Sequence, residues 1–499
     1  MFTSIDLNKL INLFKYDQTD PLLFNSSMFL FLFLGLLFLY QLLSKSQRGR
    51  IYLLIAFSMF FYYKSSGFYF LLLVFSAVFN FFMGKWIFIS QSTLRKRLIL
   101  ISSIIFNIGL LVYFKYTNFF IQIINSFGSA KLNPLDIFLP IGISFFTFKA
   151  LSYVLDLYLE KMEPERNFPN FLLYISFFPN ILAGPIDRAS RFLPQLSAPL
   201  IIDDAFVGKG VVLIISGLFK KAIIADYIST NFVDRIFDLP TRFTGAENLL
   251  GVYAYALQIY CDFSGYSDIA IGIALLLGFR LMENFDSPYQ ASSVAEFWRR
   301  WHISLSSWLL DYVFKPLQMK FRDLRTLGNA MALVVTFVLC GLWHGASWAF
   351  LFWGALHGFF MAFALFTKKP KNYIYAKLGI KNSKLLRYFQ TFVTFNLIAF
   401  AWVFFRANSF ETALQVFTQI FTFFHASVFL QFVPGYPVVT AMIILGFILH
   451  FVPKSWEIRF QEYFSRTPLI GKAIVLAAMI WLVIQVRSAE IQPFIYFQF

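Results

Sequence analysis

Two stretches decide the fold of this chain: they read EFWRRWHISLSSWLLDYVFKPL at 296–317 and CGLWHGASWAFLFWGALHG at 340–358. They contain three of the chain's five histidines, His302, His344 and His357, among mainly apolar and aromatic side chains. An ionisable group at membrane depth is costly, so such a residue is a functional-site candidate. Because imidazole titrates near neutral pH, the pattern predicts a proton-handling site inside a membrane protein.

The composition is that of a polytopic, all-helical membrane protein. Of 499 residues, 59% are hydrophobic and 14% are charged, whereas a soluble domain is about half apolar and a quarter charged. The net charge of +16 is explained by lysines and arginines in cytoplasmic loops that face anionic lipid, so no nucleic-acid partner is expected. Cys261 and Cys340 lack CxxC spacing, which predicts neither a disulfide framework nor a zinc cluster.

A helix needs about 20 apolar residues to cross a bilayer. Candidate spans lie near 22–43, 51–63, 68–89, 98–125, 135–159, 209–224, 247–278, 329–342, 346–366, 388–405, 411–432, 437–452 and 472–487. About eleven full crossings are expected from their lengths. Proline or charge interrupts 168–186 and 294–317, and these two segments are expected to be re-entrant.

Three basic loops orient the chain. They lie at 45–50, 95–97 and 368–387, and all three are expected in the cytoplasm, with the N-terminus outside. No internal repeat or soluble domain is visible. One membrane domain over 1–499 is predicted, with N-terminal helices at 1–135, a motif-bearing core at 136–366 and C-terminal helices at 388–499.

The first of the two decisive stretches predicts a charged helix. If one helix continues through it, Glu296 and Arg300 are four residues apart and can pair. Trp298, His302 and Ser306 then share one face. The alternative is an interfacial helix with tryptophans and arginines at headgroup level, in which His302 is a hydrogen-bonded structural residue.

The second stretch places a histidine in a charge-free environment. No Lys, Arg, Asp or Glu occurs from 330 to 366, and Gly341 and Gly345 flank His344. A neutral imidazole there can act as a general base, although a hydrogen-bonded core histidine fits the same pattern. Cys340 and His344 together suggest a Cys–His nucleophile as an alternative. Activation of a thiolate, however, needs an electropositive site.

His357 follows His344 by thirteen residues. On one continuous helix the two would lie about 220° apart. That separation disfavours a helical zinc pair, so no catalytic metal is expected.

Two further polar clusters interrupt apolar runs. In YCDFSGYSDIAIG at 260–272, Asp262, Ser264 and Tyr266 indicate either the lining of a water-filled cavity or a hydrogen-bonded helix-packing site. In FFPNILAGPIDRASRFLPQL at 177–196, proline and glycine break any helix before a polar turn. A surface loop is the simpler interpretation of its arginines.

Seven ordered stretches together resemble the membrane-bound O-acyltransferase family, most closely the bacterial branch typified by the alginate O-acetyltransferase membrane subunit. These stretches are LPIGISFFTFKALSYVLD at 139–156, FFPNILAGPIDRASRFLPQL at 177–196, YCDFSGYSDIAIGIALLLGF at 260–279, ENFDSPY at 283–289, EFWRRWHISLSSWLLDY at 296–312, GLWHG at 341–345 and PFIYFQF at 493–499. One departure is VFKPLQMKFRDL at 313–324, where the family commonly has a PLGG-type turn. It indicates a different cytoplasmic surface.

The resemblance implies a ring of about eleven membrane helices plus re-entrant segments around a central catalytic tunnel. It implies that His344 corresponds to the family's catalytic histidine and His302 to the second histidine of this branch. It implies acetyl-CoA as the acyl donor, used as a substrate, with no permanently bound cofactor and no metal. The acceptor would be a secreted polysaccharide or cell-wall polymer, reached through a periplasmic or extracellular acetyltransferase partner. The expected location is the bacterial inner membrane.

The clusters and the resemblance together supply the expected substrate-binding or tunnel-lining residues. These are Arg188, Asp262, Ser264, Tyr266, Asn284, Glu296, Arg299, Arg300, Trp301, Ser306, Asp311, Trp343 and His357. Arg299 and Arg300 would attract the anionic donor. Two alternatives stay open: a transporter or flippase without chemistry, and a scaffold subunit whose catalysis lies in a partner.

Overall fold

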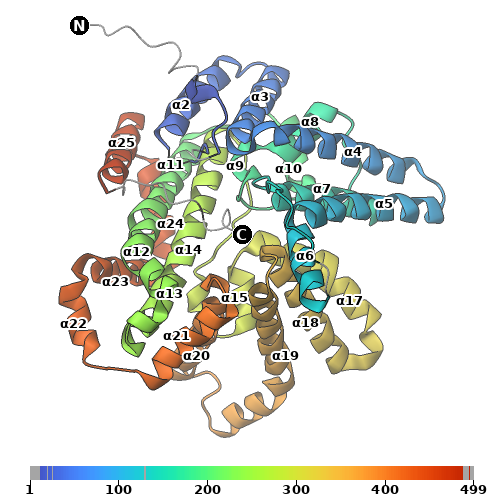
Figure 1. Cartoon of the computed structure of the whole chain (residues 1–499). Helices are drawn as coiled ribbons and strands as arrows, with labels where there is room; N and C mark the ends of the chain where they lie inside the picture. The colour runs from blue at the N-terminus through green and yellow to red at the C-terminus, as the bar shows by residue number, and fades with distance from the viewer. Residues whose placement is uncertain (1–11, 19–20, 25, 129–130, 487–493, 495–499) are drawn as a thin grey trace. The chain divides into compact units, whose positions relative to one another are not determined.

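The computed structural model describes residues 12–18, 21–24, 26–128, 131–486 and 494, and these residues contain helices and connecting loops but no strand (Figure 1). Of the stretch at 493–499, only Phe494 lies within the described residues. The chain forms two compact units, one from Met1–Gly210 with Ile273–Leu281 and one from Val211–Gly272 with Met282–Phe499. The single membrane domain expected from sequence stays a prediction.

The first unit is built from helices in the N-terminal part of the chain. They are α2 (Ser27–Leu42), α3 (Gln47–Ser66), α4 (Phe70–Ile89), α5 (Thr93–Leu111), α6 (Thr117–Phe127), α7 (Ile143–Tyr158), α8 (Phe168–Ser176), α9 (Phe178–Ile181) and α10 (Ala189–Ser197). A buried amide pair joins α4 to α5, because Asn107 Nδ2 donates to Asn80 Oδ1 at 2.8 Å. Interhelical side-chain hydrogen bonds of this kind hold membrane helices together.

The second unit carries both decisive stretches. Its helices are α12 (Asp226–Ile228), α13 (Asp234–Asp238), α15 (Val294–Arg300), α16 (Ile303–Leu309), α17 (Lys315–Lys320), α18 (Arg325–His344), α19 (Trp348–Lys377), α20 (Lys384–Arg406), α21 (Phe410–Thr422), α22 (Val428–Gly435), α23 (Pro437–Phe451), α24 (Lys454–Ser465) and α25 (Leu469–Val486). Helices α11 (Asp204–Leu218) and α14 (Gly245–Leu276) contribute to both units. Within the second unit α18 and α19 pack side by side (Figure 1).

The prediction of membrane helices is confirmed, whereas the expected number of about eleven crossings stays a prediction. Seven described helical runs are long and apolar enough to cross a bilayer, or eight if α22 and α23, bent by 101°, form one broken span. One run, Gln47–Ile89, contains both α3 and α4, each of 20 residues and joined at Gly67 with φ +59°. Since about 20 residues cross a bilayer, that run is long enough for two spans.

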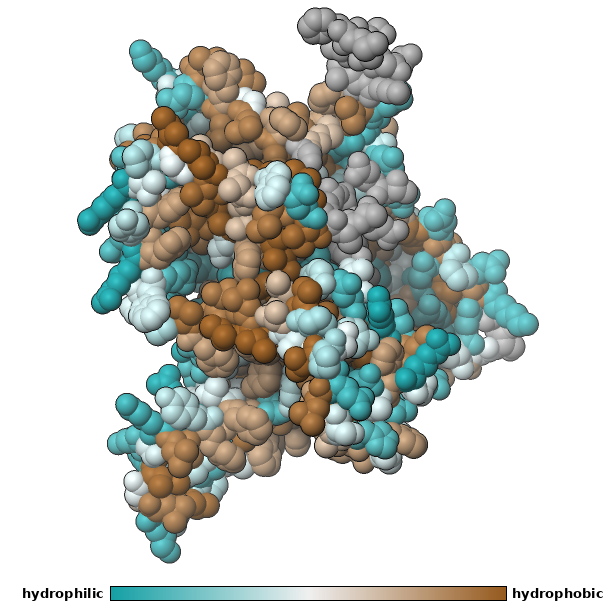
Figure 2. All heavy atoms as spheres, turned by 90° about the vertical axis from the view of Figure 1, so that its left-hand side faces the viewer, coloured by the Kyte–Doolittle hydropathy of each residue, from teal (hydrophilic) through white to brown (hydrophobic). Residues whose placement is uncertain are grey.

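The surface is suited to lipid. Figure 2 shows broad areas of brown, apolar side chains on one face. Large apolar residues such as Phe31, Phe421 and Leu430 are more than 75% exposed. Exposed apolar area on this scale is typical of a membrane interface.

Both segments expected to be re-entrant are broken into short pieces. Residues 168–186 form α8 and α9, of nine and four residues. Residues 294–317 form α15 and α16, of seven residues each, followed by a π-helical turn and the start of α17. None of these helices is long enough to span a bilayer.

Candidate active site

The helix predicted through 296–311 is interrupted at His302. This residue has φ +42° and ψ +54°, in the left-handed region that non-glycine residues seldom occupy. The single helix that would place Trp298, His302 and Ser306 on one face is therefore not present. The Trp298 indole N–H donates to His357 Nδ1 at 3.3 Å, whereas Ser306 donates to the carbonyl of Trp301. Strained backbone of this kind costs about 1–3 kcal/mol and concentrates at functional sites.

The His302 imidazole is fully buried, and the side chains of Asn284, Ser304, Phe263 and Trp343 that surround it are uncharged. Its Nδ1 lies 3.1 Å from Asn284 Oδ1 and 3.4 Å from Ser304 Oγ. Its ring centroid lies 4.6 Å from that of Phe263 and 6.0 Å from that of Trp343. Such surroundings disfavour the imidazolium form.

His344 is the last residue of α18 and is buried against aromatic rings. Its centroid lies 4.8 Å from Trp343, 5.0 Å from Trp353 and 5.2 Å from Phe405. Trp343 thus contacts both His344 and His302. The two histidines that the sequence singled out for chemistry therefore pack against one indole.

Glycines allow α18 and α19 to approach closely near His344. A Cβ on Gly341 would collide with the carbonyl oxygen of Phe350 and lie 3.1 Å from Gly354 Cα. A Cβ on Gly345 would collide with the Phe350 ring. The backbones of α18 and α19 therefore approach each other closely at Gly341, and the Phe350 ring packs against Gly345.

The continuous helix assumed between His344 and His357 is not present. Helix α18 ends at His344 and α19 begins at Trp348, so the 220° separation does not apply. Instead both imidazoles pack against Trp353, at 5.0 and 4.7 Å between ring centroids. In the part of the chain that the structure describes, no group of three His, Cys, Asp or Glu side chains could hold a metal ion.

The predicted Glu296–Arg300 pair is confirmed, at 2.8 Å. Arg300 also donates to the backbone carbonyl of Asp286 at 3.1 Å, and the backbone N–H and hydroxyl of Ser292 donate to Glu296. Burial opposes ionisation of Glu296, but the hydrogen bonds from Ser292 and Arg300 outweigh it and lower the pKa of the carboxyl. Helix α15 is thereby tied to the loop before it.

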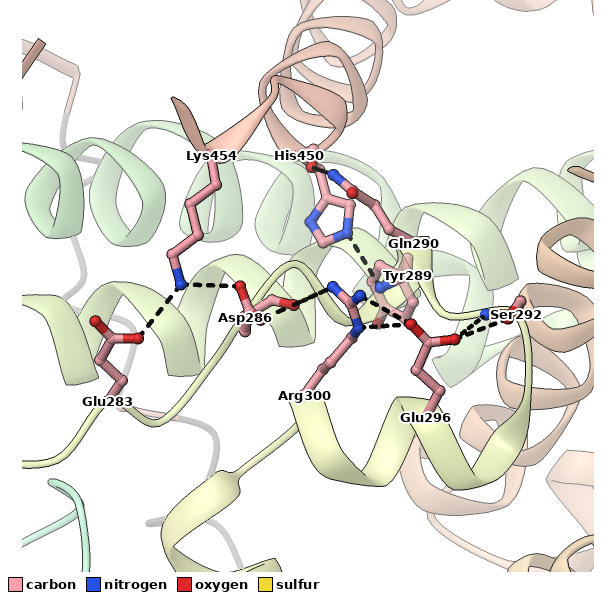
Figure 3. A network of polar contacts seen from close by, with 9 residues as sticks. All are labelled: Glu283, Asp286, Tyr289, Gln290, Ser292, Glu296, Arg300, His450 and Lys454. Carbon is pink, nitrogen blue, oxygen red and sulfur yellow. Dashed lines mark hydrogen bonds and ion pairs between the residues drawn. The ribbon is translucent and has the colours of Figure 1, made fainter. Parts of the chain in front are cut away.

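The same loop is held from the opposite side by the C-terminal helices (Figure 3). Lys454, at the start of α24, contacts Glu283 at 3.4 Å and Asp286 at 3.1 Å. The backbone N–H of Tyr289 donates to His450 Nε2 at 3.1 Å. We call residues 283–292 the clamp loop, because contacts from α15, α23 and α24 fix its course.

A cavity of about 470 Å³ opens beside α15 and α16. It is lined by Ala295, Trp298, Arg299, Ile303, Ser306, Ser307, Leu309, Leu310, Phe314, Leu333, Thr336, Phe337, Cys340 and Met361. This volume and mainly apolar lining suit a small-molecule site. Arg299 and Ser306 line the cavity, whereas Arg300 is engaged by Glu296 and Asp286.

The acidic cluster on α14 is neutralised by two lysines. Lys221 Nζ lies 2.5 Å from Asp262 and 2.7 Å from Asp226, and Lys220 Nζ lies 2.7 Å from Asp268. Sequence reasoning missed both lysines. The signal was present, because two adjacent cations interrupt the apolar run at 209–224.

Close helix packing makes these ion pairs possible. A Cβ on Gly217 of α11 would lie 2.5 Å from the carbonyl oxygen of Gly265 on α14. Ser264 and Tyr266 are buried beside this crossing. The geometry matches the helix-packing alternative for this cluster.

The polar turn at 187–191 belongs to the first unit. Arg188 donates its backbone N–H to Asp187 Oδ1 at 3.1 Å, and Arg191 lies 4.0 Å from the same oxygen. Burial raises the pKa of Asp187 to about 6, although Arg191 and Lys149 oppose that shift. Lys149, itself fully buried, donates to Asn180. Lys149 also escaped sequence reasoning.

Two other predicted site residues have contacts of different kinds. Asp311 pairs with Lys315 at 2.7 Å across one helical turn. Trp301 is buried between Phe297 and Trp402, with ring centroids at 5.5 and 5.0 Å.

Comparison with known proteins gives this arrangement a family. The model of the membrane-bound O-acyltransferase family matches residues 164–369, which include both decisive stretches. The peptidoglycan O-acetyltransferase of Helicobacter pylori is 36% identical over 427 residues, covering 79% of each chain. The probable alginate O-acetylase AlgI of Pseudomonas putida is 32% identical over 503 residues, covering 96% of this chain and all of the relative. The teichoic acid D-alanyltransferase of Bacillus subtilis is 29% identical over 54% of this chain and 69% of its own.

The chain therefore belongs to the membrane-bound O-acyltransferase family. It is an O-acyltransferase, as the resemblance of its motifs implied.

Proposed function

We propose that this enzyme passes acetyl groups from cytosolic acetyl-CoA to hydroxyls of an extracytoplasmic polysaccharide or cell-wall polymer. The observation that carries the proposal is the burial of His302 and His344 against the same indole, Trp343, at a break in α15–α16 and at the end of α18. The names of the O-acetylating relatives support the acetyl group and the polymer acceptor.

In the proposed reaction, His344 is the general base. It takes the proton from the acceptor hydroxyl as that oxygen attacks the thioester carbonyl. The C–O bond forms, the C–S bond breaks, and the proton ends on the departing thiol. His302 takes part in the proton transfer or orients the thioester carbonyl. Since a thioester is already activated, positioning and charge stabilisation supply most of the rate, and neither a metal nor a resident cofactor is required.

The cavity beside α15 and α16 is the proposed approach of the donor. Its apolar lining suits the acyl-bearing arm of a thioester, and Arg299 supplies a cation for the donor's phosphates. Arg300 serves instead to hold the clamp loop, since two acidic residues already engage it.

The finer architecture is part of the same proposal. About eleven crossings surround a tunnel in which a cytosolic and an extracytoplasmic funnel meet near the histidines. The enzyme works in a bacterial inner membrane with a periplasmic or extracellular acetyltransferase partner. Among the described helices, α3 and α4 supply two of these crossings because each has 20 residues.

His344→Gln tests the proposal. The substitution keeps a polar side chain of similar size but removes the base, so acetylation of the extracellular polymer should fall about 100- to 10,000-fold. The measurement is the acetyl content of polysaccharide, by mass spectrometry, from cells with equal levels of wild-type and variant protein.

His425→Gln is the matched control, because His425 is exposed in the loop after α21 and should leave acetylation unchanged. Near-normal acetylation with His344→Gln would replace the catalytic assignment with the scaffold or transporter alternative. An acyl group other than acetyl on the polymer would overturn the donor assignment alone.

A further inference from the structure

The side chain of Asn284, in the clamp loop, hydrogen-bonds to His302 and to two serines, Ser304 and Ser267. Its Oδ1 faces Ser304 Oγ at 2.9 Å, Ser304 N at 3.2 Å and His302 Nδ1 at 3.1 Å. Its Nδ2 donates to Ser267 Oγ of α14 at 3.1 Å. Asn284 is only 2% exposed.

The partners of Asn284 decide which way its amide points. The backbone N–H of Ser304 can only donate, so the atom that faces it must be the oxygen. An imidazole nitrogen that faces an amide oxygen must itself carry the proton. His302 is therefore protonated on Nδ1, and its Nε2 is the nitrogen without a proton.

We propose that Asn284 is a positioning residue that holds His302 in the Nδ1–H tautomer, so that Nε2 serves as a proton acceptor during acyl transfer. This inference rests on the proposed function, because it assigns a proton-transfer role to His302. The arrangement follows the logic of catalytic triads, in which a buried acceptor fixes the tautomer of the working histidine.

Two other buried histidines show that the protonated ring nitrogen differs from one site to another. His357 Nδ1 accepts from the Trp298 indole, which can only donate, so the proton of His357 is on Nε2. His450 Nε2 accepts from the backbone N–H of Tyr289, so its proton is on Nδ1. An imidazolium has no acceptor nitrogen, and both rings are therefore neutral.

The contacts of the clamp loop explain how Asn284 keeps its place. Its neighbours Glu283 and Asp286 are paired with Lys454, and Arg300 donates to the carbonyl of Asp286. The carbonyl of Asn284 itself accepts from the N–H of Ile303, the first residue of α16. The loop and the start of α16 are thus joined on both sides of His302.

The tautomer can be observed directly. Full-length protein labelled with ¹⁵N-histidine carries only five imidazoles, and a His302→Gln sample identifies the resonances of His302. The expected spectrum at neutral pH has a protonated Nδ1 and a bare Nε2. A protonated Nε2, or an imidazolium, would overturn the assignment.

Substitutions of Asn284 test its effect on the reaction. In Asn284→Asp, a carboxylate still accepts from Ser304 and from Nδ1–H, but it stabilises the imidazolium and raises the pKa of His302. The rising limb of the kcat/KM–pH profile should move upward by about one pH unit or more. Asn284→Leu should lower kcat by roughly 10- to 100-fold, because a histidine's hydrogen-bonded support is worth about that much. Within the described part of the chain, the ring contacts Phe263 of α14, Ser304 of α16, Trp343 of α18 and Asn284 of the clamp loop, and these four side chains are uncharged.

Ser267→Ala is the matched control. It removes a hydrogen bond on the far side of the Asn284 amide and should keep the wild-type pH profile. An unshifted profile for Asn284→Asp, or an equal shift for Ser267→Ala, would contradict the positioning role. If His302→Gln retains full acyl transfer while the NMR spectrum shows the expected tautomer, the proposed catalytic part of His302 fails and the structural assignment stands.

Discussion

At the scale of single residues, the site depends on donors and acceptors whose roles are unambiguous. Indole and backbone N–H groups only donate, so each fixes the protonation of an imidazole that it faces or the orientation of an amide. Trp298 is the clearest case, since its ring lines the donor cavity while its N–H reaches His357. Trp298 therefore contacts both the cavity and the His357 imidazole.

Trp298→Phe should lower stability by about 1–3 kcal/mol, because the buried Nδ1 of His357 loses its donor. Thermal unfolding of the purified protein in detergent measures the change. Trp456→Phe is the control, since Trp456 of α24 is 65% exposed and the substitution should change stability little. Equal unfolding temperatures for the two variants would contradict the role of the Trp298–His357 bond.

At the scale of helices, small residues permit the close helix packing in which buried ion pairs form. Gly217 and Gly265 let the end of α11 approach α14, and the two lysines that follow α11 reach acidic residues of α14. Buried charges are tolerated only when they are paired, so the crossing and the ion pairs depend on each other.

Gly217→Ala should destabilise the protein by about 1–3 kcal/mol, because its Cβ would press on the rigid backbone at Gly265. Gly35→Ala, in the apolar helix α2, has no atom within 4 Å of the new Cβ and should be neutral or stabilising. Unfolding temperatures of the two variants, compared with wild type, check the difference. Similar values would mean that the crossing tolerates a methyl group.

At the scale of the whole molecule, the charges of the loops predict on which side of the membrane each helical run begins and ends. In the proposed architecture the run Gln47–Ile89 forms two spans, α3 and α4, which meet at Gly67. Two spans place the basic loops at 45–50 and 95–97 on the same side, as their charges favour. One span would place them on opposite sides.

Single cysteines decide between these topologies. A membrane-impermeant thiol reagent applied to intact cells should spare cysteines placed at 45–50, 95–97 and 368–387 and label Phe68→Cys, whose position is 74% exposed between α3 and α4. Background labelling should be low, because Cys261 and Cys340 are buried. Labelling at 95–97 without labelling at 68 would establish one long span and reverse the orientation beyond it.

Several properties of this protein follow from the sequence by itself. Composition and apolar run length establish a helical membrane protein, because a bilayer imposes the same demand on every span. The ordered motifs identify the O-acyltransferase family. The Glu296–Arg300 pair is also predictable, since residues four apart on a helix meet whatever the rest of the fold does.

Only the tertiary structure decides the site itself. The break at His302 removes the face shared with Trp298, and no local pattern predicts that a histidine takes the left-handed backbone. Asn284 contacts His302, which lies 18 positions further along the chain. Lys221 contacts Asp262, which lies 41 positions further along. Helix crossings and loop closure make these contacts. Those contacts depend on how side chains and glycines pack between distant segments, so they cannot be predicted from the periodicity of any one segment.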